Sequence, residues 1–449
     1  MNCTTADIYR SIIRLGSPIT IGQLGIIVLS FADTMMVGRY STDALAAASF
    51  VNNVLVIPAM LLIGFSNGLT PIVAALFARG DTKSLCTNIR VGFLQNLLLG
   101  IILTTLLIVL YFNLDKMGQP ENLLPLIRDY YLITLGGVLL IAVTNVGRQI
   151  FEATGSATLS MWILLGGNTL NIIFNYLLIF GKFGFPELGL NGAGISTIGS
   201  RIVIAIAFIC IMALSHRYRH IFKGAINVRS DRSTARKVLQ TSWPVSLQIG
   251  IETGFFAMCG IMMGWIGEIQ LAANQILITI GQLGFTIYMG YCAAVSICIS
   301  RAIGVRDIEL LRATSRCGYR LTLFITTISS AIILLFGEQL IRIFTTDVEV
   351  ILKAVSLIPP LVLYQYADGT QIMYCNALRG TTYVKPLLII AVVAYCIVNL
   401  PIAYALGFVA GFGEYGMYYS YSVGLGVAAA LYYRYFCKKV KTLEQEFAA

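Results

Sequence analysis

Three acidic residues lie inside long apolar stretches of the 449-residue sequence. Asp33 lies in SFADTMMVGR, Glu252 in QIGIETGFFAM and Asp368 in LYQYADGTQ. An acid at the centre of a membrane-spanning helix costs roughly 2.5–3.5 kcal/mol on the insertion scale, so each of these acids needs a function or a partner. We interpret all three as binding sites for a proton or a small cation.

Buried carboxyl groups can bind either ion. Burial disfavours the charged form of a carboxyl, and a second acid nearby disfavours it further, so such a group can hold a proton near neutral pH. Carboxylate, amide and hydroxyl oxygens are also the hard ligands that Na⁺ prefers, so Glu252 and Asp368 are the expected Na⁺ ligands if the coupling ion is Na⁺. If a cationic substrate needs the same carboxylates, ion and substrate displace each other, as in an antiporter.

Each acid also has a structural alternative. Asp33 could pair with Arg39 or reach the outer interface of a membrane. Glu252 and Asp368 could form interhelical hydrogen bonds or pair with Arg201, which we take as the one basic residue inside a span.

Two further groups of side chains could contribute to binding. Asn168, Asn171 and Asn175 share one face of a helix by their spacing, where amides either hydrogen-bond across helices or present oxygens to an ion. Aromatic and methionine side chains after Glu252 could line a pocket for flat hydrophobic cations. Packing or lipid contact is the alternative for this second group, which comprises Phe255, Phe256, Met258, Met262 and Met263.

The composition predicts that a lipid bilayer surrounds these residues. Hydrophobic residues make up 57% and charged residues 12% of the chain, against roughly 45–50% and 25% in a soluble domain. The sequence has only two histidines and no Cys/His cluster, which disfavours a metalloenzyme or a zinc module. It has no glycine-rich phosphate loop, which disfavours a nucleotide motor. No nucleophile, acid and base cluster together, so we expect no enzymatic activity. We interpret the net charge of +10 as that of cytoplasmic loops, not of a nucleic-acid interface.

Apolar stretches of about 20 residues, long enough to cross a roughly 30 Å hydrocarbon layer, recur twelve times. The sequence therefore predicts an all-α integral membrane protein with twelve transmembrane helices. We expect a retained first helix in place of a cleavable signal, and ten cysteines that act as small hydrophobes without a disulfide framework. The expected spans are 12–37, 46–75, 92–113, 126–147, 160–181, 194–214, 239–265, 271–300, 318–337, 350–375, 386–408 and 418–436.

Basic residues in alternate loops predict the orientation. The segment 216–237 holds seven basic residues against the single acid Asp231, and we expect it to be a cytoplasmic linker. Shorter loops predicted on the same side include one with Arg79, Lys83 and Arg90 and another with Arg379 and Lys385. Both termini then face the cytoplasm, as in a multi-pass protein of a bacterial inner membrane.

The linker separates six predicted spans from six, and the two halves resemble each other. A shift of 226 residues superposes Pro18 on Pro244 and Gly64 on Gly290. Because six helices return the chain to its starting side, the repeats are parallel, and we expect two pseudo-symmetric bundles that rock around a cavity. The predicted parts are an N-terminal lobe at 1–215, the linker, and a C-terminal lobe with a short cytoplasmic tail at 238–449. Asp81 and Asp307 superpose as well, at loop ends, where we expect helix caps.

Several motifs resemble the multidrug and toxic compound extrusion (MATE) family, specifically its NorM-type bacterial branch. They are FADTMMVGRYSTDALAAASF, NIIFNYLLIFGKFGFPELGLNGAGISTIG, LAANQI and YADGTQIMYCNALRG. The resemblance implies two six-helix lobes that export mostly cationic, amphipathic drugs in exchange for Na⁺ or H⁺, without another cofactor. It implies a monomer in the bilayer with small-molecule partners and no nucleic acid.

The resemblance also implies roles for particular residues in both lobes. In the N-terminal lobe, Asp33 matches the family's first-helix aspartate, and the polar positions around it match Asn171, Asn175 and Thr197. In the C-terminal lobe, the cation site matches Glu252, Tyr364 and Asp368. In the proton-linked DinF-type branch an aspartate occupies the position of Asn175 and the C-terminal acids are absent, so the NorM-type branch is favoured. Which lobe couples transport stays open, as does the choice between Na⁺ and H⁺.

One other transport function fits a related two-lobe architecture, namely the flipping of lipid-linked oligosaccharides. Such a protein is expected to carry a basic central cavity for a pyrophosphate, whereas the acids stand out among the charges within the apolar stretches here. We therefore expect an exporter that works by alternating access.

Overall fold

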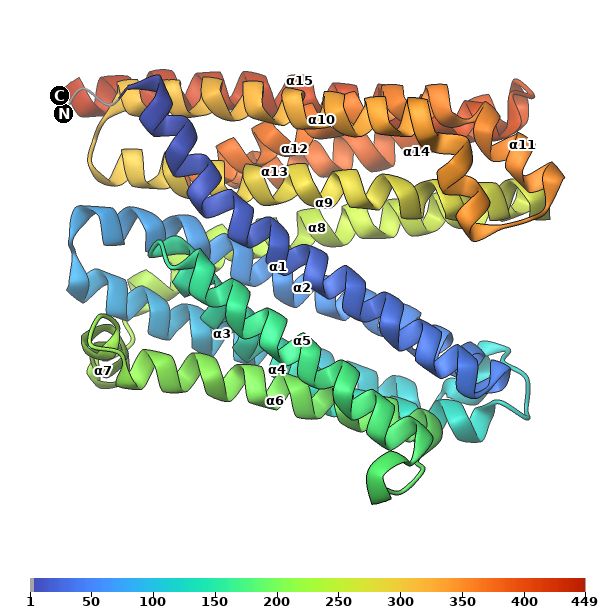
Figure 1. Cartoon of the computed structure of the whole chain (residues 1–449). Helices are drawn as coiled ribbons and strands as arrows, with labels where there is room; N and C mark the ends of the chain where they lie inside the picture. The colour runs from blue at the N-terminus through green and yellow to red at the C-terminus, as the bar shows by residue number, and fades with distance from the viewer. Residues whose placement is uncertain (1–3, 449) are drawn as a thin grey trace. The chain divides into compact units, whose positions relative to one another are not determined.

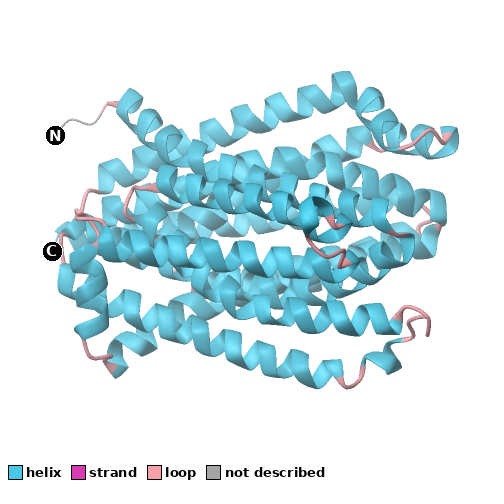
Figure 2. Ribbon diagram, turned by 60° about the horizontal axis from the view of Figure 1, so that its bottom comes forward, coloured by secondary structure: helices cyan, strands magenta, loops and turns pink. Residues whose placement is uncertain are grey.

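The computed structural model describes residues 4–448, and within this range the chain forms helices and no strand (Figure 2). Residues 1–3 and 449, which belong to the predicted lobes, lie outside the described range. The helices of the first half are α1 (Thr5–Tyr40), α2 (Thr42–Arg79), α3 (Thr82–Tyr111), α4 (Leu124–Ala153), α5 (Ala157–Phe180), α6 (Gly189–Leu214) and α7 (Arg219–Asn227), with short 3₁₀ turns η1 (Leu114–Met117) and η2 (Lys182–Gly184).

The second half repeats the alternation of long helices and short connections. Its helices are α8 (Arg232–Ile266), α9 (Glu268–Gly304), α10 (Ile308–Phe344), α11 (Val348–Ser356), α12 (Ile358–Gly380), α13 (Lys385–Ala391), α14 (Leu400–Tyr404) and α15 (Gly413–Ala448). Two π-helical segments, η3 (Val392–Asn399) and η4 (Ala405–Val409), join α13 and α14 into one element. The predicted all-α fold is confirmed.

Each predicted span lies within one helical segment or extends past it by at most two residues, apart from one break, and several helices extend well beyond their spans. The tenth span is divided between α11 and α12, which bend by 46° at Leu357. Within the described chain, ten helical segments are long and apolar enough to cross a membrane, or eleven when α11 and α12 count as one span. The twelfth predicted span, 418–436, lies within α15, whose many tyrosines and basic C-terminal half make it less apolar than the others.

Two helices begin with the predicted aspartate caps. The backbone N–H of Ser84 donates to Asp81 over 3.0 Å at the start of α3, and that of Leu310 donates to Asp307 over 2.9 Å at the start of α10. The hydrogen bonds from Ser84 lower the pKa of Asp81 from its usual value. Both predictions of a cap are confirmed, and the repeat places the caps at equivalent points of the two halves.

The helices group into two compact units. One unit comprises residues 21–246, and the other comprises residues up to Thr20 together with those from Leu247 onward. Helices α1 and α8 therefore each belong in part to both units. The predicted lobe boundaries at the basic linker differ from this division, because α7 packs against α3 and α6 within the first unit.

Each unit has its own apolar core. In the 21–246 unit, α2 packs against α3 and α4, and α6 packs against α4 and α5 (Figure 1). In the other unit, α12 lies at the centre, in contact with α9, α10 and α15. Because α12 is surrounded on three sides, a polar residue in its middle is removed from solvent by neighbouring helices.

The start of α1 packs closely on α9 within its unit. Ser17 and Tyr291 share a hydrogen bond of 3.0 Å, and Thr20 donates to the carbonyl of Ile287 over 3.3 Å. A Cβ atom added at Gly290 would lie 2.9 Å from the Cα atom of Thr20. Only glycine at this position therefore allows the two backbones to approach so closely.

We predict that Gly290→Ala destabilises the protein by about 1–3 kcal/mol, because the added methyl group forces the two helices apart. The measurement is thermal unfolding of the purified chain in detergent, followed by loss of the monodisperse peak. Gly254→Ala is the matched control, since a Cβ atom at Gly254 has no neighbour within 4 Å. Equal melting of the two variants would show that the close approach contributes nothing.

Candidate functional site

Asp33 lies in a polar cluster within the 21–246 unit. The amide of Asn175 on α5 donates to the carboxylate of Asp33 on α1, and also to Asn171 over 3.0 Å. Asn171 in turn donates to Thr197 and Ser200 of α6, over 3.4 and 3.2 Å. The structure thus brings together the four residues predicted for this half and adds Ser200.

This cluster contains an unused acceptor. The amide oxygen of Asn175 is buried and has no hydrogen-bond partner in the described part of the chain, although it belongs to the same amide that binds Asp33. A cation beside Asp33 could be bound by this oxygen as well. Asn168, the third amide of the predicted face, is also buried, and its nitrogen lacks a partner among the described residues.

Arg201 lies near Asp33 within the 21–246 unit. It interacts electrostatically with Asp33 and Tyr130, and it donates to the carbonyl of Gly137 over 3.5 Å. Among the described residues, the charged or polar groups that act on Arg201 are Tyr130 and Asp33, so the alternative in which Arg201 pairs with Glu252 or Asp368 gains no support. The hydrogen-bond partner of Asp33 is Asn175 and not Arg39.

Glu252 on α8 and Asp368 on α12 are neighbours within the second unit. Their charges are close enough to act on each other, although the residues are far apart in sequence. Asp368 is buried, with 1% of its surface exposed, and accepts a hydrogen bond from Tyr288 of α9. Glu252 is half-buried and accepts a hydrogen bond of 2.7 Å from Gln248, one helical turn earlier. The two carboxylates thus form one acid pair with different access.

Tyrosines surround the acid pair. Tyr364, predicted from the sequence, is half-buried one turn before Asp368 and interacts electrostatically with both acids. Tyr395 of η3 is fully buried, hydrogen-bonds Glu252 and accepts a hydrogen bond of 3.2 Å from Gln371. Phenol and amide groups can support either a neutral or a charged carboxyl, because their hydrogen bonds can be rearranged.

The predicted substrate-contacting residues fall on different faces of α8. Phe255 and Met262 are buried in the apolar core, as is Met263, whereas Met258 is 43% exposed. Phe256 is half-buried, and its ring lies edge-on to Tyr364 with the centroids 6.4 Å apart. Both phenylalanines thus contact tyrosines beside the acid pair, since the ring of Phe255 lies 5.3 Å from that of Tyr395 between centroids.

Two buried arginines were not predicted from the sequence. Arg148 lies in α4 and Arg379 in the last turn of α12, and they are 7% and 9% exposed. The view that Arg201 is the one basic residue inside a span is wrong, because the predicted spans also contain Arg14, Arg128, Arg320, Lys353 and Arg434. The placement of Arg379 in a loop is wrong because α12 continues beyond its apolar stretch. Arg148 forms an ion pair of 2.6 Å with Glu152, also buried.

Tyr288, Tyr395 and Gln248 were also missed. The two tyrosines stand in apolar surroundings that are typical of core positions, so the sequence offered no signal for them. Gln248 could have been found, since it precedes Glu252 by four residues and so shares its helix face.

The donor atoms of the acid pair fit a hard monovalent cation or a proton. Two carboxylates with nearby hydroxyl and amide oxygens are the ligand types that Na⁺ prefers. The described residues contain no group of three or more His, Cys, Asp or Glu side chains that could hold a metal ion. Chemically, this arrangement can exchange one cation for another.

The chain is similar to known proteins along most of its length. The MatE family model matches residues 18–177 and 244–405. The two segments begin 226 residues apart, which is the offset of the predicted repeat and supports it.

Curated relatives and solved structures match the chain from end to end. Proteins named "Probable multidrug resistance protein NorM" are 26% identical over 422 residues in Xylella fastidiosa and 28% identical over 435 residues in Agrobacterium fabrum. Each alignment covers 94% of this chain, and 90% and 92% of the relative, respectively. A crystal structure of MATE in the bent conformation aligns with a TM-score of 0.89 at 22% identity, and covers 99% of both chains.

Proposed function

The chain belongs to the MatE family, and on this premise we propose that it is a secondary active exporter that exchanges Na⁺ or H⁺ for cationic or amphipathic drugs. As a member of this family it is a multi-pass membrane transporter and not an enzyme. The names of its relatives support multidrug efflux as the physiological class of transport.

One observation carries the choice of an exchange mechanism. Asp33, Glu252 and Asp368 lie in membrane-length helices, yet none of them is in an ion pair within 4 Å in the described part of the chain. Each is held by hydrogen bonds from neutral groups. A carboxylate kept in this way, without a permanent counter-ion, can accept a travelling cation and release it again.

The proposal assigns the exchange to the acid pair. Glu252 is partly accessible and Asp368 is buried behind it, so an incoming ion meets Glu252 first and Asp368 second. Tyr288 and Tyr364 hold Asp368 by hydrogen bonding and by proximity. Phe256 offers a ring face to a flat cationic drug near the same carboxylates. The drug and the ion then compete for one negative site.

Asp33 forms a second cation site in this proposal. Asn171, Asn175 and Thr197 supply amide and hydroxyl groups around it, including the unpaired amide oxygen of Asn175. Arg201 lies near enough to weaken cation binding there by repulsion. Asp33 is a single carboxylate, whereas Glu252 and Asp368 supply two that act on each other, so we propose the acid pair as the main coupling site.

The proposal includes the location of the protein. The basic segment 216–237 and the basic residues near the end of α15 favour a cytoplasmic side for both termini, in a bacterial inner membrane. The repeat of two parallel halves supports alternating access.

The test is transport of ethidium, a flat fluorescent cation, by the purified chain in proteoliposomes. We expect ethidium movement to speed up severalfold when a Na⁺ gradient or a pH gradient is imposed, with each gradient tested alone. Empty liposomes under the same gradients are the control. Ethidium movement that neither gradient changes would overturn the proposed exchange, and gradient-independent flipping of a lipid-linked sugar would favour the alternative function.

A further inference from the structure

A buried positive charge lies one amide group away from Glu252. The guanidinium of Arg379 donates to the side-chain oxygen of Gln248 over 3.2 Å, and the nitrogen of the same amide donates to Glu252 over 2.7 Å. Gln248 is 1% exposed, so water does not separate these groups. The three side chains form a continuous line of hydrogen bonds from Arg379 on α12 to Glu252 on α8.

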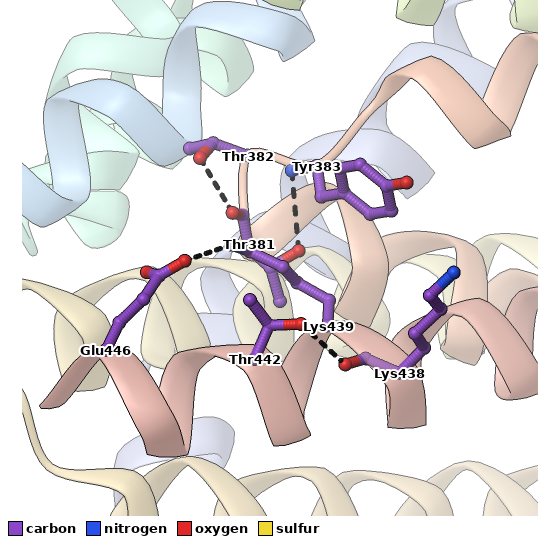
Figure 3. A network of polar contacts seen from close by, with 7 residues as sticks. All are labelled: Thr381, Thr382, Tyr383, Lys438, Lys439, Thr442 and Glu446. Atoms are coloured by element: carbon purple, nitrogen blue, oxygen red, sulfur yellow. Dashed lines mark hydrogen bonds and ion pairs between the residues drawn. The ribbon is translucent and has the colours of Figure 1, made fainter. Parts of the chain in front are cut away.

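The end of α12 holds Arg379 in this position. Asn376, one turn earlier, accepts a hydrogen bond of 3.3 Å from the guanidinium. The turn that follows the helix is fixed by Thr381, whose hydroxyl donates to the carbonyl of Leu378 over 2.7 Å. The same hydroxyl accepts from the N–H of Tyr383 over 3.4 Å (Figure 3). The arginine therefore lies on a rigid helix end and not on a loose loop.

The other half of the molecule contains a buried arginine of a different kind. Arg148 lies near the end of α4, which is the fourth long helix of its half as α12 is of the second half. It is neutralised directly by Glu152, over 2.6 Å. Arg379 has no acid within 4 Å among the ion pairs of residues 4–448, and its buried Nε atom has no hydrogen-bond partner in that range. Its charge is thus left to act on Glu252.

The ionisable groups around Glu252 come from α12, η3 and α15. Within the described chain, Arg379 is the basic group whose charge acts on Glu252. The other members are neutral or acidic, namely Asp368, Tyr364, Cys375, Tyr395 and Tyr432. A cation that binds at Glu252 is therefore repelled by one fixed charge.

We propose that Arg379 is a positioning residue for ion release: its fixed charge, linked through Gln248, weakens the binding of the coupling cation to Glu252 and returns the carboxylate to Gln248 when the cation leaves. This inference rests on the proposed exchange function. It deepens that function by naming the group that keeps the ion from binding too tightly. The bound cation and the guanidinium compete for one carboxylate. When the ion leaves, the hydrogen bonds from Arg379 to Gln248 and from Gln248 to Glu252 form again.

The test compares Arg379→Gln with Arg379→Lys in proteoliposomes. The measurement is the initial rate of ethidium movement as a function of Na⁺ concentration at fixed pH, and as a function of pH without Na⁺. We expect ethidium transport by the Arg379→Gln variant to reach half of its maximal rate at about tenfold lower concentration of the ion that drives the wild type. The reason is that removal of the repelling charge tightens ion binding. We expect a lower maximal rate as well, because release slows.

Two controls separate charge from structure. Arg379→Lys keeps the charge and is expected to retain an ion dependence close to that of the wild type. Arg316→Gln removes an exposed charge from the same unit and is expected to change neither quantity. An unchanged half-maximal concentration in Arg379→Gln, or an equal shift in Arg379→Lys, would overturn the inference while the exchange function stood. If transport by the wild type responds to neither Na⁺ nor H⁺, both the role of Arg379 and the proposed exchange function are overturned.

Discussion

Asp368→Asn is expected to lower gradient-driven ethidium transport by about 10- to 100-fold. The substitution keeps the size of the side chain and removes the charge that binds the ion. A hydrogen bond to a charged group contributes about 1.5–3 kcal/mol, which corresponds to a factor of this size. Glu252→Gln is expected to act in the same direction. The measurement is the initial rate in proteoliposomes under the gradient that drives the wild type.

The loss must be specific to the acid pair. Glu309→Gln neutralises an exposed acid of the same unit and should transport ethidium at the wild-type rate. Binding of ethidium in detergent, measured by fluorescence, shows whether each variant is still folded. If Asp368→Asn and Glu252→Gln both export at the wild-type rate, the acid pair is not the coupling site, and Asp33 becomes the remaining candidate.

Arg148→Met is expected to destabilise the protein by about 3–5 kcal/mol, which is the effect of breaking a buried ion pair by removal of one partner. Arg148 and Glu152 are 7% and 4% exposed, so without Arg148 the carboxylate of Glu152 would remain unpaired in an apolar interior. The amide of Gln23, turned so that its oxygen faces the guanidinium, also accepts from Arg148 over 2.8 Å and would lose this donor. The measurement is the free energy of unfolding in a titration with denaturing detergent.

A double variant tests the reason for this loss. Arg148→Met combined with Glu152→Met removes both charges and should recover most of the stability, because a pair of apolar side chains of similar volume replaces the ion pair. A double variant as unstable as Arg148→Met alone would show that the arginine acts through its other contacts. Arg342→Met, at an exposed ion pair with Glu338, should change stability by less than about 1 kcal/mol.

Hydropathy was sufficient to predict the helices and the acids. The long apolar stretches mark the helices because a bilayer needs about 20 apolar residues per crossing. Asp33, Glu252 and Asp368 could be found because an acid in such a stretch is costly, and the structure places two of them side by side. The same reasoning predicted that Asn171 and Asn175 share a helix face, and both amides belong to the Asp33 cluster.

Residues at the ends of the apolar stretches could not be predicted in this way. The helices α4 and α12 extend beyond their apolar stretches, so Arg148 and Arg379 looked like loop residues although neighbouring helices bury them. Tyr288 and Tyr395 were hidden for the opposite reason, since a tyrosine among apolar residues is typical of any core. Which helix a hydroxyl faces depends on tertiary packing, which a single sequence does not reveal.

The packing of the first residues of α1 on α9 has a consequence for biosynthesis. Ser17 and its partner Tyr291 are separated by 274 residues. At a translation rate of roughly 5–20 residues per second, the ribosome needs roughly 14–55 s to make that stretch. During this time the start of α1 waits in the membrane without its final neighbours. The unit that contains it can be completed only late in synthesis. In a nascent chain that stops in its second half, the start of α1 would therefore lack its packing partner and be open to degradation by quality-control proteases.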